Sequence, residues 1–399
     1  MKYFGTDAPA TFVDASTETS AIVSDMPKRS SSTVLPLRSL NRALLERQLL
    51  LRRSTLSVEK TLQHLVGMQA QATNPPYFGL WTRLDGFQPE ALSRLISRRR
   101  AVRIALMRST IHLVTARDCL PLRTLLQPVL ERALLTGSAY GRALEGMDIS
   151  ALVAFGRALV EEKPRPLIEL GELLQERWPE RDAKSLAYAI RNLVPLVQVP
   201  PRGLWGVGGQ AASTTAESWL GGKASSELSL DELILRYLAA FGPASVKDVQ
   251  TWSGLTRLRE VIEELRPRLR TFRDEHGVEL FDVPNAPLPE PEVPAPPRFL
   301  PDFDNVLLSH ADRTRIISEE HRQAIATANG LFLSTFLVDG FVRGTWKLEQ
   351  ERERAALVIS PFTALKKPER AALAEEGARL LAFAAPDART PEVRFVPSK

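Results

Sequence analysis

The sequence contains very little cysteine and no long apolar segment. Cys119 is the single cysteine among 399 residues, so the chain cannot form an intramolecular disulfide. No run of about 18 or more apolar residues is present, and the sequence therefore predicts neither a membrane-spanning helix nor a membrane partner. The first 35 residues lack the apolar stretch and cleavage site of a signal peptide, and their composition predicts a disordered tail. We expect a cytoplasmic protein.

The common signatures of metal, nucleotide and nucleophile sites are also missing from the sequence. The five histidines and one cysteine show no CxxC or HExxH spacing, so we expect no metal. The glycine-rich segment Gly203–Gly209 has no Walker lysine and is interpreted as a turn between two strands. No G-x-S-x-G motif occurs, which disfavours hydrolysis through an acyl-enzyme. On these grounds we expect no cofactor.

Basic charge is present and is unevenly distributed. Lys and Arg number 52 against 47 Asp and Glu, and 41 of the 52 are arginine, the residue that makes planar bidentate contacts with phosphates and base edges. Residues 36–120 carry a net charge of +9, whereas residues 226–297 carry −5. A nucleic-acid partner would explain the basic segment. The alternative is that this segment contacts an acidic part of the same chain, such as residues 226–297.

The order of predicted elements repeats three times along the chain. Each repeat has amphipathic helices followed by a strand, a turn and a strand, which is the order of a winged helix. A proline-rich stretch follows, and beyond it apolar strands and one helix predict a further module. The sequence thus predicts an α+β protein with these parts: a disordered tail (1–35), a first (36–120), second (121–225) and third (226–283) winged helix, a proline-rich linker (284–297) and a β-rich C-terminal module (298–399).

Two helices are predicted near the start of the first repeat. Apolar residues at helical spacing predict a helix from Leu37 to Arg53 whose interleaved arginines face solvent. A second helix, capped by Ser57, is expected to continue past Met68 and to stop at residues 74–76, where Asn-Pro-Pro breaks it. This prediction places the motif Gln-Ala-Gln of residues 69–71 at a helix end, where the two glutamines would point about 200° apart.

Local signals place two of the predicted hairpins. Alternation over residues 102–114 predicts a hairpin that turns near Arg108-Ser109, and Asp339-Gly340 between two apolar runs predicts another. Residues 305–308 are expected to form a strand of the C-terminal module.

Four stretches together resemble a known family. They are Gln69-Ala70-Gln71 with Pro75-Pro76-Tyr77, LMRSTIHLVTARD, FDNVLLSHADRTRII and LVDGFVRGTWKLE. In this order they resemble the winged-helix DNA glycosylases of the AlkZ and AlkX type, and the resemblance covers residues 36–399. It implies three tandem winged helices and a β module around a basic channel for duplex DNA, and monofunctional removal of bulky or crosslinking alkyl adducts from purines. The second motif position is usually acidic in the AlkX branch, so Gln71 places this chain nearer to the AlkZ-like branch, which is associated with self-resistance in antibiotic producers.

The resemblance also implies site residues. The family's catalytic glutamine motif corresponds to Gln69 and Gln71, and we hypothesise that Gln71 positions the attacking water while Gln69 orients that water or the sugar. For DNA contacts we expect residues in and before the first hairpin, in the second wing and near residue 313: Arg98, Arg99, Arg100, Arg108, His112, Arg202, Arg313 and Arg315. The expected partner is double-stranded DNA that carries alkylated purines, such as nitrogen-7 adducts of guanine, and the expected state is a monomer.

Two other functions are compatible with the charge and the periodicity. A non-catalytic winged-helix regulator of transcription would bind DNA with the same elements, and a protein-interaction scaffold is a third possibility. Only the Gln-Ala-Gln motif distinguishes a glycosylase from these two classes.

Overall fold

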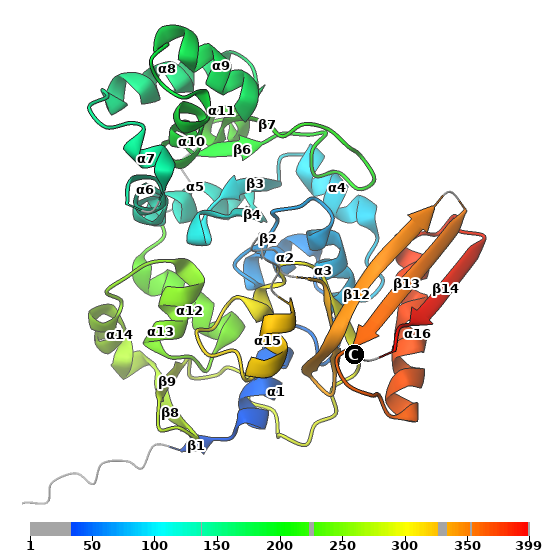
Figure 1. Ribbon diagram of the computed structural model, residues 1–399. Helices are drawn as coiled ribbons and strands as arrows, with labels where there is room; N and C mark the ends of the chain where they lie inside the picture. Colours follow the sequence, from blue (N-terminus) through cyan, green and yellow to red (C-terminus); the bar gives the residue numbers. More distant parts are fainter. Residues whose placement is uncertain (1–32, 137, 223–226, 326–332, 352, 398–399) are drawn as a thin grey trace, which may run out of the picture. The chain divides into compact units, whose positions relative to one another are not determined.

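The chain forms a mixed α+β structure with three sheets among the described residues (Figure 1). The structure is a computed structural model that describes residues 33–136, 138–222, 227–325, 333–351 and 353–397. The expected disordered tail lies outside the described residues as far as residue 32. Its last two residues form strand β1 (Val34–Leu35), which pairs in parallel with β8 (Arg270–Asp274). From residue 33 onward the chain is one compact unit.

Helices and short strands alternate through the first half of the chain. Serines start several helices. The predicted cap Ser57 accepts a hydrogen bond from the backbone N–H three residues later, and Ser229 and Ser245 do the same. The elements of this half, after β1, are α1 (Leu37–Arg47), α2 (Val58–His64), β2 (Met68–Gln69), α3 (Pro75–Arg83), α4 (Pro89–Ser97), β3 (Ala101–Ala105), the 3-10 turn η1 (Met107–Ser109), β4 (Ile111–Thr115), α5 (Ala116–Leu125), α6 (Gln127–Leu135), α7 (Ala139–Arg142), α8 (Ile149–Glu162), β5 (Arg165–Pro166), α9 (Leu167–Arg177), α10 (Ala183–Leu193), β6 (Leu196–Gln198), β7 (Ala212–Thr215) and α11 (Ala216–Leu220).

A six-stranded sheet joins the first two predicted repeats. Its strand order is β2-β4-β3-β6-β7-β5, and β3 pairs with β6 through Arg103↔Gln198 and Ile104↔Val197. The hairpin predicted over residues 102–114 is confirmed as β3 and β4. Because β3 lies between β4 and β6, the strands expected as two separate wings share one sheet, and helix α5 runs through the predicted boundary at residue 120.

The second half of the chain builds two further sheets. The three-stranded sheet has the order β1-β8-β9, and the five-stranded sheet has the order β10-β11-β12-β13-β14, with α16 packed on β13 and β14 (Figure 1). The elements are α12 (Leu230–Phe241), α13 (Val246–Ser253), α14 (Arg259–Leu265), η2 (Arg266–Arg268), β8, β9 (Glu279–Asp282), β10 (Arg298–Leu300), η3 (Asn305–Leu307), α15 (Glu319–Ile325), β11 (Thr335–Val338), β12 (Phe341–Glu351), β13 (Arg354–Pro361), α16 (Lys367–Ala384) and β14 (Thr390–Phe395).

Two local predictions for the C-terminal module have opposite outcomes. The hairpin at Asp339-Gly340 is confirmed: β11 and β12 pair around these residues, whose φ angles of 47° and 83° are those of a tight hairpin turn. The strand expected over residues 305–308 is wrong. The chain forms the 3-10 turn η3 there because Asp304 caps it by accepting a hydrogen bond from the N–H of Val306.

Two of the three arginines of α1 are buried, which contradicts the prediction that its arginines face solvent. Arg42 and Arg47 are at most 2% exposed. Both terminal nitrogens of Arg47 donate to the carboxylate of Asp282, at 2.6 and 2.8 Å, and Arg42 forms an ion pair with Asp339. Acidic side chains from the second half of the chain therefore cover the helix face that the sequence pattern assigned to water.

The proline-rich segment predicted as a linker lies along α1. Three arginines of this helix donate to backbone carbonyls of the segment: Arg38 to Pro291 at 2.7 Å, Arg42 to Val293 at 2.7 Å and Arg47 to Pro287 at 3.2 Å. A proline residue has no backbone N–H, but its carbonyl oxygen still accepts hydrogen bonds. The segment from 284 to 297 is thus fixed by side-chain hydrogen bonds.

The burial of Arg47 gives a direct test of this arrangement. Replacing Arg47 with Ala leaves the carboxylate of Asp282 buried without its partner, and we expect the free energy of unfolding to fall by about 3–5 kcal/mol. Urea unfolding of the two proteins measures the difference. Arg52→Ala is the control, because Arg52 is 84% exposed in its pair with Glu46 and should cost less than about 1 kcal/mol. Equal stabilities of the two variants would contradict the structure here.

Candidate active site around Gln69 and Gln71

The Gln-Ala-Gln motif begins on strand β2 at Gln69 and leaves it at Ala70, so the motif does not lie at a helix end. Helix α2 stops at His64 because Val66 and Gly67 adopt positive φ angles of 54° and 88°, and a Cβ on Gly67 would lie 2.6 Å from the side chain of Val114. The chain then pairs with β4 in the register Gln69↔His112. The prediction of a helix continuing past Met68 is wrong, since pairing with β4 overrides the local helical pattern.

Both glutamines lie against the β3–β4 hairpin. The pairing with β4 continues one residue beyond β2, because the N–H of Ala70 donates to the carbonyl of Ile111 at 2.8 Å. Gln69 bonds Arg108 at the hairpin tip, and Gln71 bonds the backbone N–H of Ile111.

Hydrogen bonds fix both the side chain and the backbone of Gln69. Its side chain is buried, with the residue 6% exposed, and its Oε1 accepts a hydrogen bond from Nη2 of Arg108 at 2.7 Å. Its backbone N–H donates to Oδ1 of Asn305 at 3.3 Å, and Nδ2 of Asn305 donates to the carbonyl of Gly67 at 2.8 Å. A cavity of about 10 Å³ adjoins Gln69, which is room for about one water molecule.

Gln71 is exposed, in contrast to Gln69. Its Oε1 accepts a hydrogen bond from the backbone N–H of Ile111 at 3.2 Å. A carbonyl oxygen has two lone pairs, so this bond leaves Gln71 with one further acceptor position and two amide donors. Gln71 can therefore bind a water or a substrate group from solvent.

Arg103 of β3, one strand beyond β4, supports the motif, and sequence reasoning missed it. Its Nη2 donates to the carbonyl of Ala70 at 2.7 Å and its Nη1 to that of Ala72 at 3.2 Å, while Nε donates to Oε1 of Gln198. The available signal was a single charged residue inside the apolar strand Ala101–Ala105, whose residues are all buried. Arg103 thus fixes the backbone on both sides of Gln71.

Two buried arginines give this site a positive charge. Burial, together with the nearby charge of Arg202, lowers the pKa of Arg103 to about 10, and burial together with Arg313 lowers the pKa of Arg108 to about 10. Both groups stay protonated at neutral pH. Neither forms an ion pair with a carboxylate among the residues that the structure describes. An anionic ligand would supply the missing counter-charge.

His112 lies beside Gln69 but does not fit the expected DNA contact. It is 1% exposed, and burial together with the charge of Arg108 lowers its pKa to about 3. Its Nδ1 lies 3.0 Å from the carbonyl of Thr110, which can only accept, so Nδ1 carries the proton. His112 is therefore a neutral, buried residue without the charge or the exposure that a phosphate contact requires.

Three of the other expected DNA contacts lie together in the segment before β3. Arg98, Arg99 and Arg100 are exposed between α4 and β3, where Arg99 stacks over Trp219 at 4.0 Å and Arg100 pairs with Glu59. The hairpin tip with Arg108 is at the other end of β3, so these arginines are not part of the glutamine site.

The remaining three residues differ in exposure. Arg202 is half-buried in the connection between β6 and β7 and donates to the carbonyl of Gly209 at 3.0 Å, and Arg313 is half-buried near Arg108. Arg315 is 5% exposed and its Nη1 donates to the carbonyl of Pro243, so it lacks the surface that a DNA contact needs.

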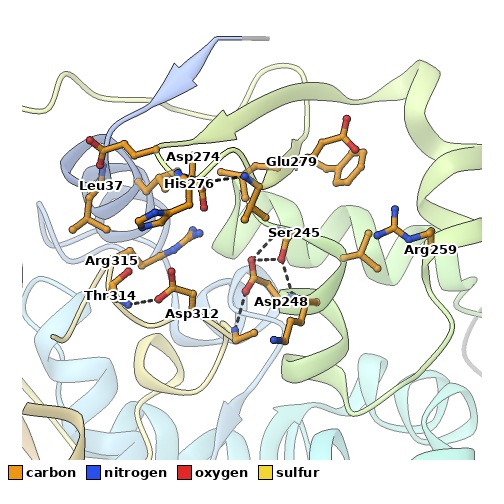
Figure 2. Close-up of a pocket in the computed structure, with 18 residues that line it drawn as sticks. Leu37, Ser245, Asp248, Arg259, Asp274, His276, Glu279, Asp312, Thr314 and Arg315 are labelled. Carbon is orange, nitrogen blue, oxygen red and sulfur yellow. Dashed lines mark hydrogen bonds between the residues drawn. The ribbon is translucent and has the colours of Figure 1, made fainter. Parts of the chain in front are cut away.

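Arg315 also lines a separate cavity of about 740 Å³ between α13, the β8–β9 hairpin and residues 311–315. Figure 2 shows the acidic side chains Asp274, Glu279 and Asp312 around it, and Asp248 bound within its own helix cap. Neither glutamine of the motif is among its lining residues. Among the described residues, no cluster of three or more His, Cys, Asp or Glu could hold a metal ion.

Comparison with known proteins shows to which family the chain belongs. The family model described as "DNA glycosylase AlkZ-like" matches residues 62–383. The chain belongs to the AlkZ-like DNA glycosylase family. It is 25% identical over 347 residues to a curated protein of Streptomyces sahachiroi named "Interstrand DNA cross-link repair glycosylase", covering 80% of this chain and 88% of the relative.

A solved structure of the same family shares the fold. The DNA glycosylase AlkZ of Streptomyces sahachiroi superposes with a TM-score of 0.75 at 21% identity, covering 91% of this chain and all of that structure. The AlkZ-like family membership confirms the expected resemblance and the expected enzyme class, a DNA glycosylase, and it replaces the alternatives of a regulator or a scaffold. No helix in the described part of this AlkZ-like chain has the length and apolarity to span a membrane.

The neutral state of His112 makes the stability of the protein depend on pH. Both His112 and the buried His310 have pKa values lowered to about 3, against 6.5 in the unfolded chain, so unfolding takes up protons as the pH falls below 6.5. Each histidine should reduce the free energy of unfolding by up to about 1.4 kcal/mol per pH unit between pH 6 and 5. We expect His112→Gln to reduce this slope by about half of the histidine contribution, as measured by urea unfolding at several pH values.

The exposed His276 provides the matched control for this experiment. His276→Gln should leave the slope of stability against pH unchanged. A slope that stays the same in His112→Gln would mean that His112 is charged in the folded protein.

Proposed function

We propose that this AlkZ-like protein hydrolyses the glycosidic bond of alkylated purines in duplex DNA, with nitrogen-7 adducts of guanine, bulky or crosslinking, as substrates. The observation that carries the proposal is that Gln69 and Gln71 both form hydrogen bonds with the β3–β4 hairpin, whose tip carries the cationic Arg108. The curated relative, named for the repair of interstrand crosslinks, supports this substrate class. We infer a role in DNA repair or in self-resistance to a DNA-alkylating antibiotic.

The chemistry that such a substrate needs matches this site. Alkylation at nitrogen-7 of guanine makes the base cationic, so the base leaves without protonation and the enzyme needs no strong acid. The remaining task is to hold a water near the anomeric carbon and to stabilise the developing charge on the sugar. The exposed Gln71 has a free acceptor position for this water, and Gln69 bonds the same hairpin.

A bulky adduct also limits how the base is recognised. The cavity beside Gln69 has a volume of about 10 Å³, which suits a water molecule and not a nucleobase. We therefore propose that the enzyme acts on the lesion within the duplex, without turning the base into a pocket of the kind that base-flipping enzymes use.

DNA binding is assigned to the exposed arginines and to the uncompensated charge at the hairpin. We propose that the repeats act as three tandem winged helices, and that Arg98 and Arg99 contact phosphates at the base of the first hairpin, with Arg202 near the motif. The charges of Arg103 and Arg108 add to the potential that attracts the DNA backbone. A monomer suffices for this assignment.

Substitution of the glutamines tests the proposed reaction. Gln71→Ala and Gln69→Ala should each slow excision from a duplex containing nitrogen-7 alkylguanine by about 100-fold, measured as heat-labile abasic sites under single-turnover conditions. DNA affinity should stay within about threefold, because neither residue carries charge. Gln88→Ala is the control: Gln88 is exposed at the start of α4 and makes no side-chain cap. Unchanged excision in both motif variants would refute the proposed site.

Salt dependence tests the phosphate contacts separately. If Arg98 contacts one phosphate, Arg98→Ala should reduce the slope of log affinity against log salt concentration by about 0.9. Fluorescence anisotropy with an unmodified duplex measures this slope. The exposed Arg52 serves as the control, and Arg52→Ala should keep the wild-type slope. A slope that is the same in Arg98→Ala and in the wild type would remove Arg98 from the DNA-binding face.

A further inference from the structure

The orientation of the Gln69 side-chain amide follows from its partner. The guanidinium of Arg108 contains only donors, so the amide atom 2.7 Å from its Nη2 must be the carbonyl oxygen. The NH₂ group of Gln69 is therefore the end that points away from Arg108. The opposite orientation would bring two donors together.

The backbone at the hairpin tip is strained in a way that directs Arg108 to this position. Arg108 and Ser109 are consecutive residues with φ angles of 55° and 58°, a conformation that tight hairpin turns usually assign to Asn and Gly. Two left-handed residues with side chains cost free energy, and such strain persists where surrounding contacts impose it. The tip is held by Ser109, whose hydroxyl donates to Asn192 at 2.9 Å and whose carbonyl accepts from Arg191 at 3.0 Å.

The guanidinium of Arg108 is also fixed from the opposite side. Its Nη1 donates to the carbonyl of Trp252 at the end of α13, and Trp252 is 1% exposed in the core. Gly254, which follows α13, lets the backbone approach, because a Cβ there would lie 3.3 Å from the N atom of Arg108. Arg108 therefore bridges the end of α13 and Gln69, and both of its terminal nitrogens are engaged.

We propose that Arg108 is a positioning residue that fixes the amide of Gln69 with its oxygen bound and its NH₂ group turned into the site. Gln69 then acts as a hydrogen-bond donor toward an oxygen of the DNA substrate, on the deoxyribose or an adjoining phosphate, and the task of accepting from the attacking water is left to Gln71. This inference rests on the proposed function. It gives Arg108 a role beyond the phosphate contact that the sequence predicts.

A near-isosteric variant tests which atom of Gln69 matters. Gln69→Glu keeps an oxygen for Arg108 and replaces the NH₂ donor with an acceptor. We expect excision of nitrogen-7 alkylguanine to slow as much as in Gln69→Ala, by about 100-fold, while the melting temperature is retained. Excision at the wild-type rate in Gln69→Glu would overturn the proposal, because the oxygen would then be the functional atom.

A double-mutant cycle tests whether Arg108 acts through Gln69. Arg108→Met should slow single-turnover excision by about 10- to 100-fold with DNA affinity within about threefold, and it should add less than about twofold in the Gln69→Ala background. Arg108→Lys, which retains charge but cannot bridge both partners, should be impaired as well. Independent, multiplicative effects would overturn the proposal, as would a loss of DNA affinity without a loss of excision rate.

A measurement without DNA separates this inference from the proposed reaction. In protein labelled with ¹⁵N-glutamine, the side-chain NH₂ signal of Gln69 should shift in Arg108→Met and stay in place in Arg98→Met. If the wild type excises no alkylated purine but this shift occurs, the proposed function is wrong, whereas the hydrogen bond between Arg108 and Gln69 is supported. If the wild type excises alkylated purines but the Gln69 signal does not shift in Arg108→Met, the proposed positioning of Gln69 by Arg108 is wrong.

Discussion

The pairing of residues 68–70 with β4 is the constraint on which the site depends. Without it, the sequence after α2 would follow its helical pattern, and the two glutamines would diverge. The pairing is possible because Gly67 permits a close approach to Val114, and it is locked by side chains from other parts of the chain. Asn305 binds the backbone before the motif, Arg103 the backbone on both sides of Gln71, and the hairpin tip of β3 and β4 supplies Arg108. The site is thus a property of the sheet and not of the local sequence.

The arginines of residues 36–120 form two populations that the amino-acid composition does not distinguish. Five of the arginines in residues 36–120 form ion pairs with carboxylates from beyond residue 280, and these pairs hold the two halves of the chain together: Arg38, Arg42, Arg47, Arg53 and Arg83. The alternative that the basic segment contacts acidic residues of the same chain therefore holds for these five. Arg103 and Arg108 instead bind carbonyl and amide oxygens, which leaves their charge uncompensated. Only the second population, with the exposed arginines near residue 99, contributes potential toward an anionic partner.

Sequence reasoning succeeded where local physics decides the structure. The Asp339-Gly340 turn, the hairpin over residues 102–114 and the serine caps were predicted from positive φ preferences, alternation and side-chain capping. It failed where distant contacts override local preference: the strand at Gln69, the 3-10 turn at Asn305 and the buried face of α1. For the site, the two glutamines were identified through family resemblance, but Arg103 and the engagement of Arg108 were not, since both depend on carbonyl groups whose positions follow only from the assembled fold.

The contacts of α1 have a consequence for the synthesis of the protein. The ion-pair partner of Arg42 is Asp339, which is synthesised 297 residues later. At about 5–20 residues per second, that interval corresponds to about 15–60 s during which the helix exists on the ribosome without its partner. Throughout this time its buried arginines and leucines have no native surface to cover them. The native packing around Arg42, near the start of the chain, therefore cannot be completed before the hairpin at residue 339 has been made.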